Sequence, residues 1–132
     1  MTTSNIKTTI PCDLEKVWTI ITSLQDYAWR SDISNIKIVN DHQFIEYTKD
    51  GYATTFTITV KAPMHRYEFN MDNSNMRGHW TGLLHAVESG VEIDFTEDVT
   101  AKKVFMKPFV KSYLKKQQRT YIQDLEKACQ DK

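Results

Sequence analysis

The chain has 132 residues, of which 40% are hydrophobic and 26% are charged, a balance typical of one globular domain spanning 1–132. Its 17 basic and 17 acidic residues cancel, so no net charge points to nucleic acid or to an anionic membrane as a partner. Two cysteines, Cys12 and Cys129, make no disulfide framework, and no stretch resembles a signal peptide or the ~18 apolar residues of a membrane span. We therefore expect a reduced, cytoplasmic protein with no membrane insertion.

The first quarter of the chain predicts one strand and two short helices. Apolar and polar residues alternate over residues 4–10, which indicates a strand that Pro11 ends. Asp13 is a suitable N-cap for a helix that runs to about residue 23. A second short helix is predicted over residues 24–29.

Residues 36–99 predict six strands joined by short turns, an arrangement typical of an antiparallel meander. The expected turns lie at Asn40-Asp41, Asp50-Gly51, 62–65, 72–75 and Ser89-Gly90. Asp50-Gly51 is a strong signal for a two-residue type I′ turn. Closing it in this way pairs Tyr47 with Thr54 and Ile45 with Phe56.

Propagating this register through the sheet produces one apolar face and one polar face, as expected when one side is covered. The apolar face collects Ile36, Ile38, Ile45, Tyr47, Phe56, Ile58, Val60, Tyr67, Phe69, Met71, Met76, Trp80, Leu84, Ile93, Phe95 and Val99. Glu97 also falls on it, and Phe44 and Leu83 fall on the polar face. Gly78 and Gly82 flank Trp80 on the apolar face, where they either bend the sheet or leave volume for a cavity, and the two readings are compatible.

The last quarter of the chain predicts a long amphipathic helix opened by Pro108. Its inward stripe is expected to hold Val110, Leu114, Gln117, Tyr121, Leu125 and Ala128, widened by Phe109 and Tyr113. A basic cluster lies around this helix, comprising Lys102, Lys103, Lys107, Lys111, Lys115, Lys116 and Arg119. Such a cluster is commonly a solvated face, and a surface for an acidic partner is the alternative.

The order strand, two helices, six strands and a long helix resembles the START-like, birch-pollen-allergen-like (SRPBCC) superfamily, and within it the small bacterial polyketide cyclase/dehydrase-type proteins. The matching patterns are Pro11-x-x-x-x-x-Val17-Trp18, Trp29, Glu46, Gly51, Pro63-x-x-Arg66, Gly78-His79-Trp80-Thr81, Gly90-Val91, Leu114 and Tyr121-x-x-x-Leu125. The resemblance implies an α+β helix-grip fold, a curved antiparallel sheet of about seven strands around a long C-terminal helix. It also implies a cavity for an apolar molecule, but no particular reaction.

Glu97 is the strongest candidate for a catalytic residue. A carboxyl group facing an apolar cavity has a raised pKa, which suits acid or base catalysis. Tyr121 and Gln117, on the inward face of the helix, complete a set that could orient a carbonyl or hydroxyl group. The alternative is that Glu97 lies at the cavity mouth and pairs with Lys102 or Lys103.

No metal or cofactor is expected. His79 and His85 share a face but stand six residues apart, ~20 Å along a strand. His42 and His65 fall in turns, and no glycine-rich phosphate loop is present in the sequence. Cys12 has no evident base beside it, so it is a poor candidate for a nucleophile.

Three functions remain open. The first is a binding protein for a small hydrophobic or amphipathic ligand, lipid- or polyketide-like, in a pocket of aromatic walls and few polar groups. The expected lining is Tyr47, Phe56, Phe69, Trp80, Phe95, Glu97, Tyr113, Gln117 and Tyr121. The second is a cyclase, dehydratase or isomerase in which Glu97 transfers protons. The third is an interaction module with a filled core.

Overall fold

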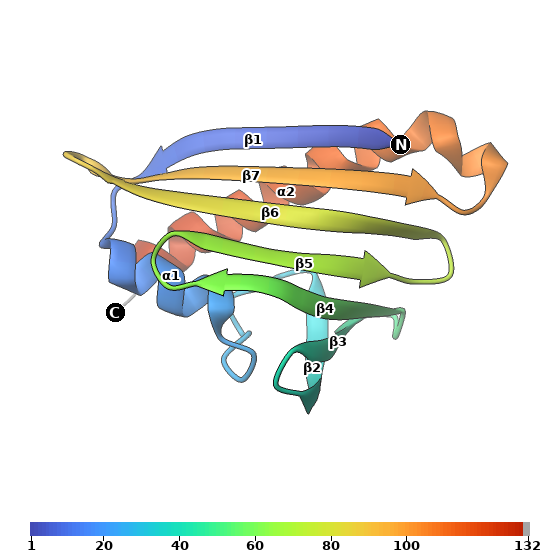
Figure 1. The fold of residues 1–132 in the computed structure, drawn as a ribbon, viewed down its shortest axis with the longest axis horizontal. Coiled ribbons are helices and arrows are strands. Elements are labelled where there is room, and N and C mark those ends of the chain that lie inside the picture. The colour runs from blue at the N-terminus through green and yellow to red at the C-terminus, as the bar shows by residue number, and fades with distance from the viewer. Residues whose placement is uncertain (131–132) are drawn as a thin grey trace.

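The computed structural model describes residues 1–130 and shows one antiparallel sheet curved around a long helix (Figure 1). The seven strands lie in the order β1-β7-β6-β5-β4-β3-β2. The elements are β1 Thr2–Ile10, α1 Leu14–Thr22, β2 Ile33–Asn40, β3 Gln43–Thr48, β4 Ala53–Ala62, β5 Arg66–Asp72, β6 Met76–Val87, β7 Gly90–Ala101, the 3₁₀ turn η1 Val104–Met106 and α2 Lys107–Gln130. The α+β helix-grip fold expected from the sequence is confirmed.

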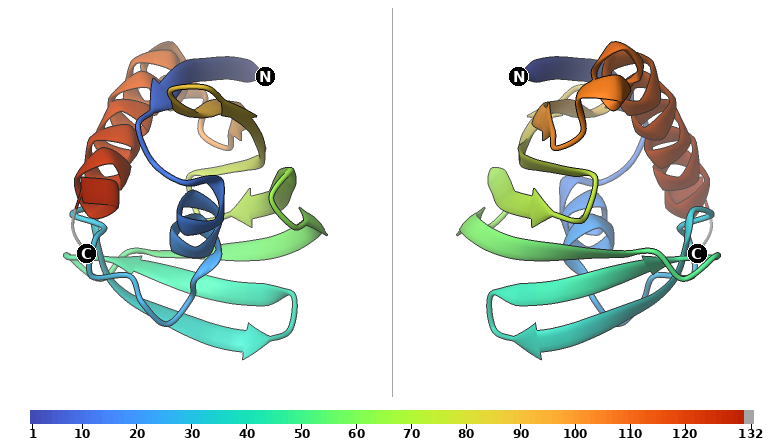
Figure 2. Two further views of the ribbon diagram at one scale, coloured as in Figure 1. Left: turned by 90° about the vertical axis from the view of Figure 1, so that its left-hand side faces the viewer. Right: turned by 90° about the vertical axis from the view of Figure 1, so that its right-hand side faces the viewer.

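Figure 2 shows how the curved sheet and the two helices enclose an interior. Helix α2 runs along the open side of the sheet beside β1, and α1 closes one end. The buried core includes Val17 and Trp18 of α1, Phe95 of β7 and Leu125 of α2. The core therefore draws on both helices and the long strands between them.

Helix α1 begins where the sequence predicts, but the second short helix does not form. The Asp13 side chain accepts a hydrogen bond from the Lys16 backbone N–H, which caps α1. Residues 24–32 form bends and a turn instead of a helix. The Ser23 hydroxyl accepts a hydrogen bond from the Asp26 N–H at 3.1 Å, and this local bond competes with helical pairing.

The register of β3 differs by one residue from the prediction. Tyr47 pairs with Ala53 and Phe44 pairs with Phe56, because the loop after Thr48 is longer than a two-residue turn. Thr48 donates its backbone N–H to the Tyr52 carbonyl at 2.9 Å, and Gly51 adopts a φ of 87°. This geometry is that of a three-residue loop with glycine in the left-handed position.

A one-residue shift turns every side chain of a strand to the other face. Phe44, predicted on the polar face, is therefore buried against the core. Glu46 also turns inward, whereas Ile45 and Tyr47 turn outward. The predicted inward positions of Ile45 and Tyr47 were wrong for this reason.

The other long hairpins keep the predicted faces except at Val60, whose predicted inward position was wrong because an irregularity after Ile58 pairs it with Glu68 of the outer face. Phe69 pairs with Trp80, and Trp80 pairs with Glu97. These pairings differ by two residues from the predicted register, and an even shift preserves the face of every side chain. Glu97 accordingly lies on the inner face of the sheet.

Gly82 provides space for the Trp80 ring and not for a cavity. A Cβ atom at Gly82 would lie 2.4 Å from the Trp80 ring and 3.3 Å from the Phe95 ring. At Gly78 a Cβ atom would lie 2.5 Å from the Asp98 carbonyl oxygen. Both glycines are thus positions of close approach, and the volume that the missing Gly82 side chain leaves is filled by indole.

The buried stripe of α2 differs in part from the expected one. It holds Val110, Leu114, Gln118, Ile122 and Leu125. Phe109 and Tyr113, expected to widen the inward stripe, are 68% and 50% exposed. The first two turns of α2 extend toward one end of the sheet, so little of the sheet faces their flank (Figure 1).

Candidate functional site

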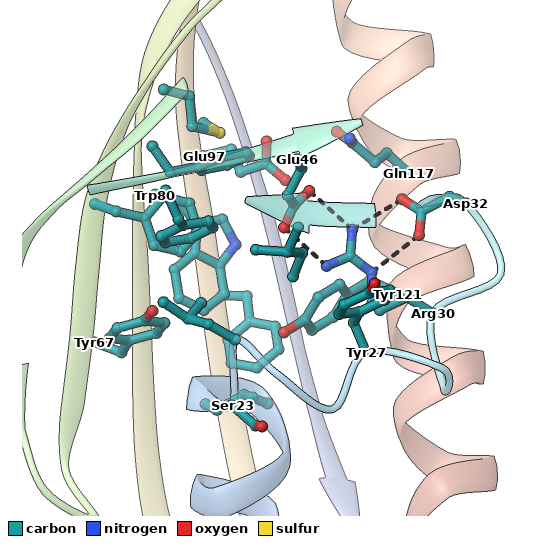
Figure 3. A pocket seen from close by; sticks show the side chains of 18 of the residues that line it. Ser23, Tyr27, Arg30, Asp32, Glu46, Tyr67, Trp80, Glu97, Gln117 and Tyr121 are labelled. Carbon is teal, nitrogen blue, oxygen red and sulfur yellow. Dashed lines mark hydrogen bonds and ion pairs between the residues drawn. The ribbon is translucent and has the colours of Figure 1, made fainter. Parts of the chain in front are cut away.

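A pocket lies between the inner face of the sheet, the segment that follows α1, and α2 (Figure 3). Its cavity volume is about 80 Å³, within about 800 Å³ of space between atoms that also counts the open mouth and the solvent there. Its lining comprises Ile21, Ser23, Leu24, Tyr27, Trp29, Arg30, Asp32, Ile36, Phe44, Glu46, Phe56, Tyr67, Phe69, Met71, Trp80, Phe95, Glu97, Gln117, Gln118 and Tyr121. A second hollow adjoins it, sharing Glu46, Glu97 and Gln117 and bordered further out by Tyr113.

Aromatic rings in mutual contact form the walls of the pocket. Trp80 stacks on Phe69 with ring centroids 4.8 Å apart and contacts Phe95 at the same separation. Phe44 stacks on Phe56 at 5.0 Å. Rings packed in this way hold one another in place. The walls are therefore shaped before any ligand arrives.

Arg30 is the central cation of the pocket and binds two carboxylates. Its guanidinium donates to Asp32 at 2.9 and 3.0 Å and to Glu46 at 3.2 and 3.3 Å. It also lies over the Tyr121 ring, 5.0 Å from the centroid. Burial alone would lower the pKa of Arg30, but the two carboxylates outweigh it and raise the pKa. Arg30 is therefore a permanent cation.

Glu46 is the partner that keeps Arg30 buried. Burial raises the pKa of Glu46, and the Arg30 charge partly offsets this effect. Both Glu46 oxygens accept hydrogen bonds from Arg30. The pair joins the segment after α1 to strand β3, and Figure 3 shows its bonds as dashed lines.

Glu97 lies in the pocket without such a partner. It is 6% exposed, and within residues 1–130 no hydrogen bond or ion pair of its carboxyl group is found. Burial raises its pKa to about 7, and the Arg30 charge only partly opposes that shift. Lys102 binds Asp72 and Lys103 binds Asn75, so neither lysine pairs with Glu97.

Other polar groups at the pocket also lack protein partners among the described residues. They are the hydroxyls of Tyr67 and Tyr121, the indole N–H of Trp80 and the side-chain amide of Gln117. Each of these groups reaches accessible space, because every fully buried side-chain nitrogen or oxygen within residues 1–130 has a hydrogen-bond partner. In Figure 3 the Tyr121 hydroxyl and the Trp80 nitrogen point into the space that these residues border. Burial raises the pKa of Tyr67 to about 12 and raises that of Tyr121, so both hydroxyls keep their protons at neutral pH.

Gln118, next to Gln117, has a structural role that the sequence did not reveal. Its amide oxygen accepts from the Ser4 hydroxyl at 2.7 Å, and its nitrogen donates to the Ser4 carbonyl at 3.1 Å. Ser4 and Gln118 are both buried. This bonding fastens α2 to β1 and leaves Gln117 free to face the pocket.

Most of the residues predicted for the site come together, and three important ones were missed. Phe56, Phe69, Trp80, Phe95, Glu97, Gln117 and Tyr121 line the pocket, Tyr113 borders the adjoining hollow, and Tyr47 lies on the outer face. Arg30, Asp32 and Glu46 were not foreseen. The available signals were the match of Trp29 and Glu46 to the family pattern, and charged residues beside Trp29 and within an apolar strand.

The remaining candidates form no second centre. Within residues 1–130 no three His, Cys, Asp or Glu side chains gather as metal ligands. His79 hydrogen-bonds Glu68 and Asn70 on the outer face of the sheet. Cys12 and Cys129 lie together, and burial followed by their mutual hydrogen bond raises the pKa of the Cys129 thiol to about 12, far from a reactive thiolate.

A family model described as polyketide cyclase / dehydrase and lipid transport matches residues 1–130. The chain belongs to this family. No curated protein matches it in a sequence comparison. The polyketide cyclase / dehydrase and lipid transport family thus accounts for nearly the whole length of the protein.

Solved structures agree on the fold. A START superfamily protein from Mycobacterium smegmatis matches with a TM-score of 0.88 and 11% identity, covering 97% of each chain. The protein MLL2253 from Mesorhizobium loti matches with a TM-score of 0.80 and 13% identity, covering 96% of each chain. The Aha1 dimer from Colwellia psychrerythraea matches with a TM-score of 0.77 and 15% identity, covering 98% of this chain and 96% of that one. At such identities the likeness shows the START-like fold alone.

Membership in the family supports a ligand-binding domain of the START and polyketide cyclase type. Within residues 1–130 no helix combines the length and the apolar character that crossing a bilayer requires.

Proposed function

We propose that this chain binds a small, mainly apolar ligand that is neutral or cationic, with its polar end at Glu97. The observation that carries the proposal is a buried carboxyl group without a protein partner in a pocket walled by aromatic rings. The Trp80 and Tyr121 polar groups supply further contacts for one hydroxyl, carbonyl or amine group. A flat ring system suits the stacked walls.

The charge balance of the pocket argues against an anionic ligand such as a fatty acid. The pocket contains three carboxyl groups, those of Asp32, Glu46 and Glu97, and one cation, the guanidinium of Arg30. Asp32 and Glu46 already bind that guanidinium. A buried ligand carboxylate would face Glu97 without a free cation. Desolvating an unpaired charge is costly, so the pocket should reject it.

The first experiment is native mass spectrometry of the purified protein, followed by extraction of any bound molecule. We expect a discrete apolar compound. A binding series then tests the ligand class with one aromatic body and three end groups, using 2-naphthylmethanol, 2-naphthylmethylamine and 2-naphthoate. We expect the alcohol and the amine to bind and the carboxylate to fail. Failure of all three, together with clean apo protein, would favour a filled-core interaction module.

Glu97→Gln tests the role of the carboxyl group. We expect amine binding to fall roughly tenfold or more above pH 7, because a desolvated charge-assisted hydrogen bond is lost, while alcohol binding changes modestly. Glu92→Gln is the matched control, since Glu92 lies on the same strand but pairs with Lys7 at 3.7 Å outside the pocket. An equal effect of both variants on amine binding would contradict the assignment.

An enzyme of cyclase or dehydratase type is the second candidate, favoured by the pKa of Glu97 near 7. On a β-hydroxy ketone, the Glu97 carboxylate would take the proton from the carbon beside the carbonyl group. The neutral acid would then return it to the departing hydroxyl, releasing water and an unsaturated ketone. We expect Glu97→Gln to abolish turnover while ketone binding survives, with the wild-type rate rising through pH 7. Unchanged turnover in that variant would exclude Glu97 as the proton carrier.

A further inference from the structure

Four large apolar side chains stand exposed within ten residues at the start of α2. Val104 and Phe105 of η1 are 76% and 73% exposed, and Phe109 and Tyr113 of α2 are 68% and 50% exposed. We call these four residues the apolar ridge. Phe109 and Tyr113 lie one turn apart on the same side of the helix. Scattered exposed apolar residues need no explanation, but a group of this size does.

The chain segment between β7 and α2, with the first turns of α2, lies at one end of the molecule (Figure 1). It borders a surface groove lined by Tyr52, Met76, Met106, Phe109 and Tyr113 among others. Within residues 1–130, no sheet strand or helix covers the ridge side chains. An apolar surface exposed in this way has an unfavourable contact with water that a suitable partner would remove.

The chain segment that carries the ridge is strongly basic, although Asp50 lies in the adjoining groove. The segment from Lys102 to Gln123 carries seven cations and no carboxylate, although the whole chain is neutral. Lys107 occupies the first residue of α2, and the first turn has no acidic residue. A cation at a helix N-terminus opposes the helix dipole, so this arrangement does not serve helix stability.

The lysines beside the ridge are exposed and only partly engaged. Lys102 binds Asp72, Lys103 binds Asn75, and Lys111 donates to the Thr3 carbonyl. Only the first of these contacts neutralises a charge. Lys103, Lys107 and Lys111 therefore remain net positive around the apolar side chains.

We propose that the apolar ridge docks this protein onto the surface of an anionic lipid bilayer. Phe105 and Phe109 would enter the interface between head groups and acyl chains, and the lysines would contact anionic head groups. Shallow apolar insertion combined with basic residues is a sufficient pair of signals for reversible attachment. The docking lies at the surface and involves no membrane-spanning segment.

A bilayer fits the ridge better than a protein partner. The cores of protein interfaces are depleted of lysine, whereas here every ridge residue has a lysine within two positions of sequence. Pairing of two copies through the ridge would place both sets of lysines face to face and create like-charge repulsion. An anionic lipid surface complements the charge and accepts the apolar side chains at once.

Tyr113 connects this surface to the pocket. It borders both the ridge groove and the hollow that contains Glu97 and Gln117. Docking would bring that hollow close to the bilayer, where apolar molecules dissolve. The docking itself does not depend on the proposed ligand, so each can fail without the other.

The test is flotation with vesicles of phosphatidylcholine alone and of phosphatidylcholine mixed with phosphatidylglycerol. We expect binding to the anionic vesicles, weakening with added salt, and none to the neutral ones. The variant Phe105→Ser/Phe109→Ser should lose roughly tenfold or more in vesicle affinity, and Lys107→Gln/Lys111→Gln a similar factor. Circular dichroism verifies the fold of each variant.

Ile38→Ser/Leu83→Ser is the matched control, because both residues are exposed apolar side chains on strands β2 and β6, away from the ridge. We expect it to bind vesicles like the wild type. Absence of vesicle binding, equal binding to neutral vesicles, or an equal loss in this control would overturn the proposal. A concentration-dependent dimer in light scattering that Phe105→Ser/Phe109→Ser abolishes would assign the ridge to a second copy instead.

Discussion

Glu97 and Glu46 are two carboxylates of one pocket with different electrostatic surroundings. Glu46 holds both oxygens against the Arg30 guanidinium, whereas Glu97 has only the more distant field of that cation. Burial acts on both, so the difference comes from pairing. Glu46 therefore suits a structural role, and Glu97 suits contact with a ligand.

The raised pKa of Glu97 predicts a pH-dependent stability difference. The pKa of Glu97 rises from 4.5 in the unfolded chain to about 7 in the folded protein, so the folded state binds the proton more tightly. The resulting stabilisation is fully present below pH 4.5 and is lost as the pH rises through 7. The shift in the pKa of Glu97 corresponds to about 3 kcal/mol of unfolding free energy. We expect Glu97→Gln to exceed the wild type in unfolding free energy by about this amount at pH 8 and to differ little at pH 4.5. Urea titrations at the two pH values measure it. A difference independent of pH would contradict the burial of an unpaired carboxyl.

At the scale of elements, the position of the Trp80 ring in the pocket wall depends on Gly82, two residues later on β6. The Trp80 ring lies against Gly82, where a Cβ atom would come within 2.4 Å of it. We expect Gly82→Ala to lower the unfolding free energy by about 1–3 kcal/mol, because the indole must leave its stacked position on Phe69. Chemical denaturation measures the loss.

A double-mutant cycle identifies the cause. In a Trp80→Leu background the added methyl group has a smaller neighbour, so the cost of Gly82→Ala should shrink. An undiminished cost in that background would place the strain in the backbone of β6 and not in the indole contact.

At the scale of the whole molecule, Arg30 joins three parts that are distant in sequence. It belongs to the segment after α1, binds Glu46 of β3 and lies over Tyr121 of α2. We expect Arg30→Gln to lower the unfolding free energy by about 3–5 kcal/mol, because it leaves the Glu46 carboxylate buried and unpaired. Thermal or urea denaturation measures it.

Adding Glu46→Gln to Arg30→Gln should recover part of that stability by removing the stranded charge. Arg66→Gln is the control, since the Arg66 side chain is half exposed in its pair with Glu68 and should contribute at most about 1 kcal/mol. Equal losses of unfolding free energy in Arg30→Gln and Arg66→Gln would show that the buried ion pair of the pocket stabilises the fold no more than a surface ion pair does.

The periodicity of apolar residues was sufficient to predict β1, α1, the strands of the sheet and the C-terminal helix. The inward direction of Glu97 and Trp80 also followed, because register errors of two residues preserve the face. The predicted helix over 24–29 failed because hydrogen bonds of Ser23 and of the neighbouring turn satisfy that backbone locally. Phe109 and Tyr113 matched the helical spacing but lie at the end of the sheet, where they border open hollows and stay largely exposed.

Local pattern by itself thus determined the elements, their order and most of the pocket wall, because side-chain periodicity follows from backbone geometry alone. Only the tertiary structure decided the register of β3, and with it the presence of Glu46 and Arg30 in the pocket. The two possible loops at Asp50-Gly51 differ by one residue, and both are common hairpin connections. Contacts from elsewhere in the chain favour the observed one: Phe44 stacks on Phe56, and Arg30 reaches Glu46 across sixteen positions of sequence.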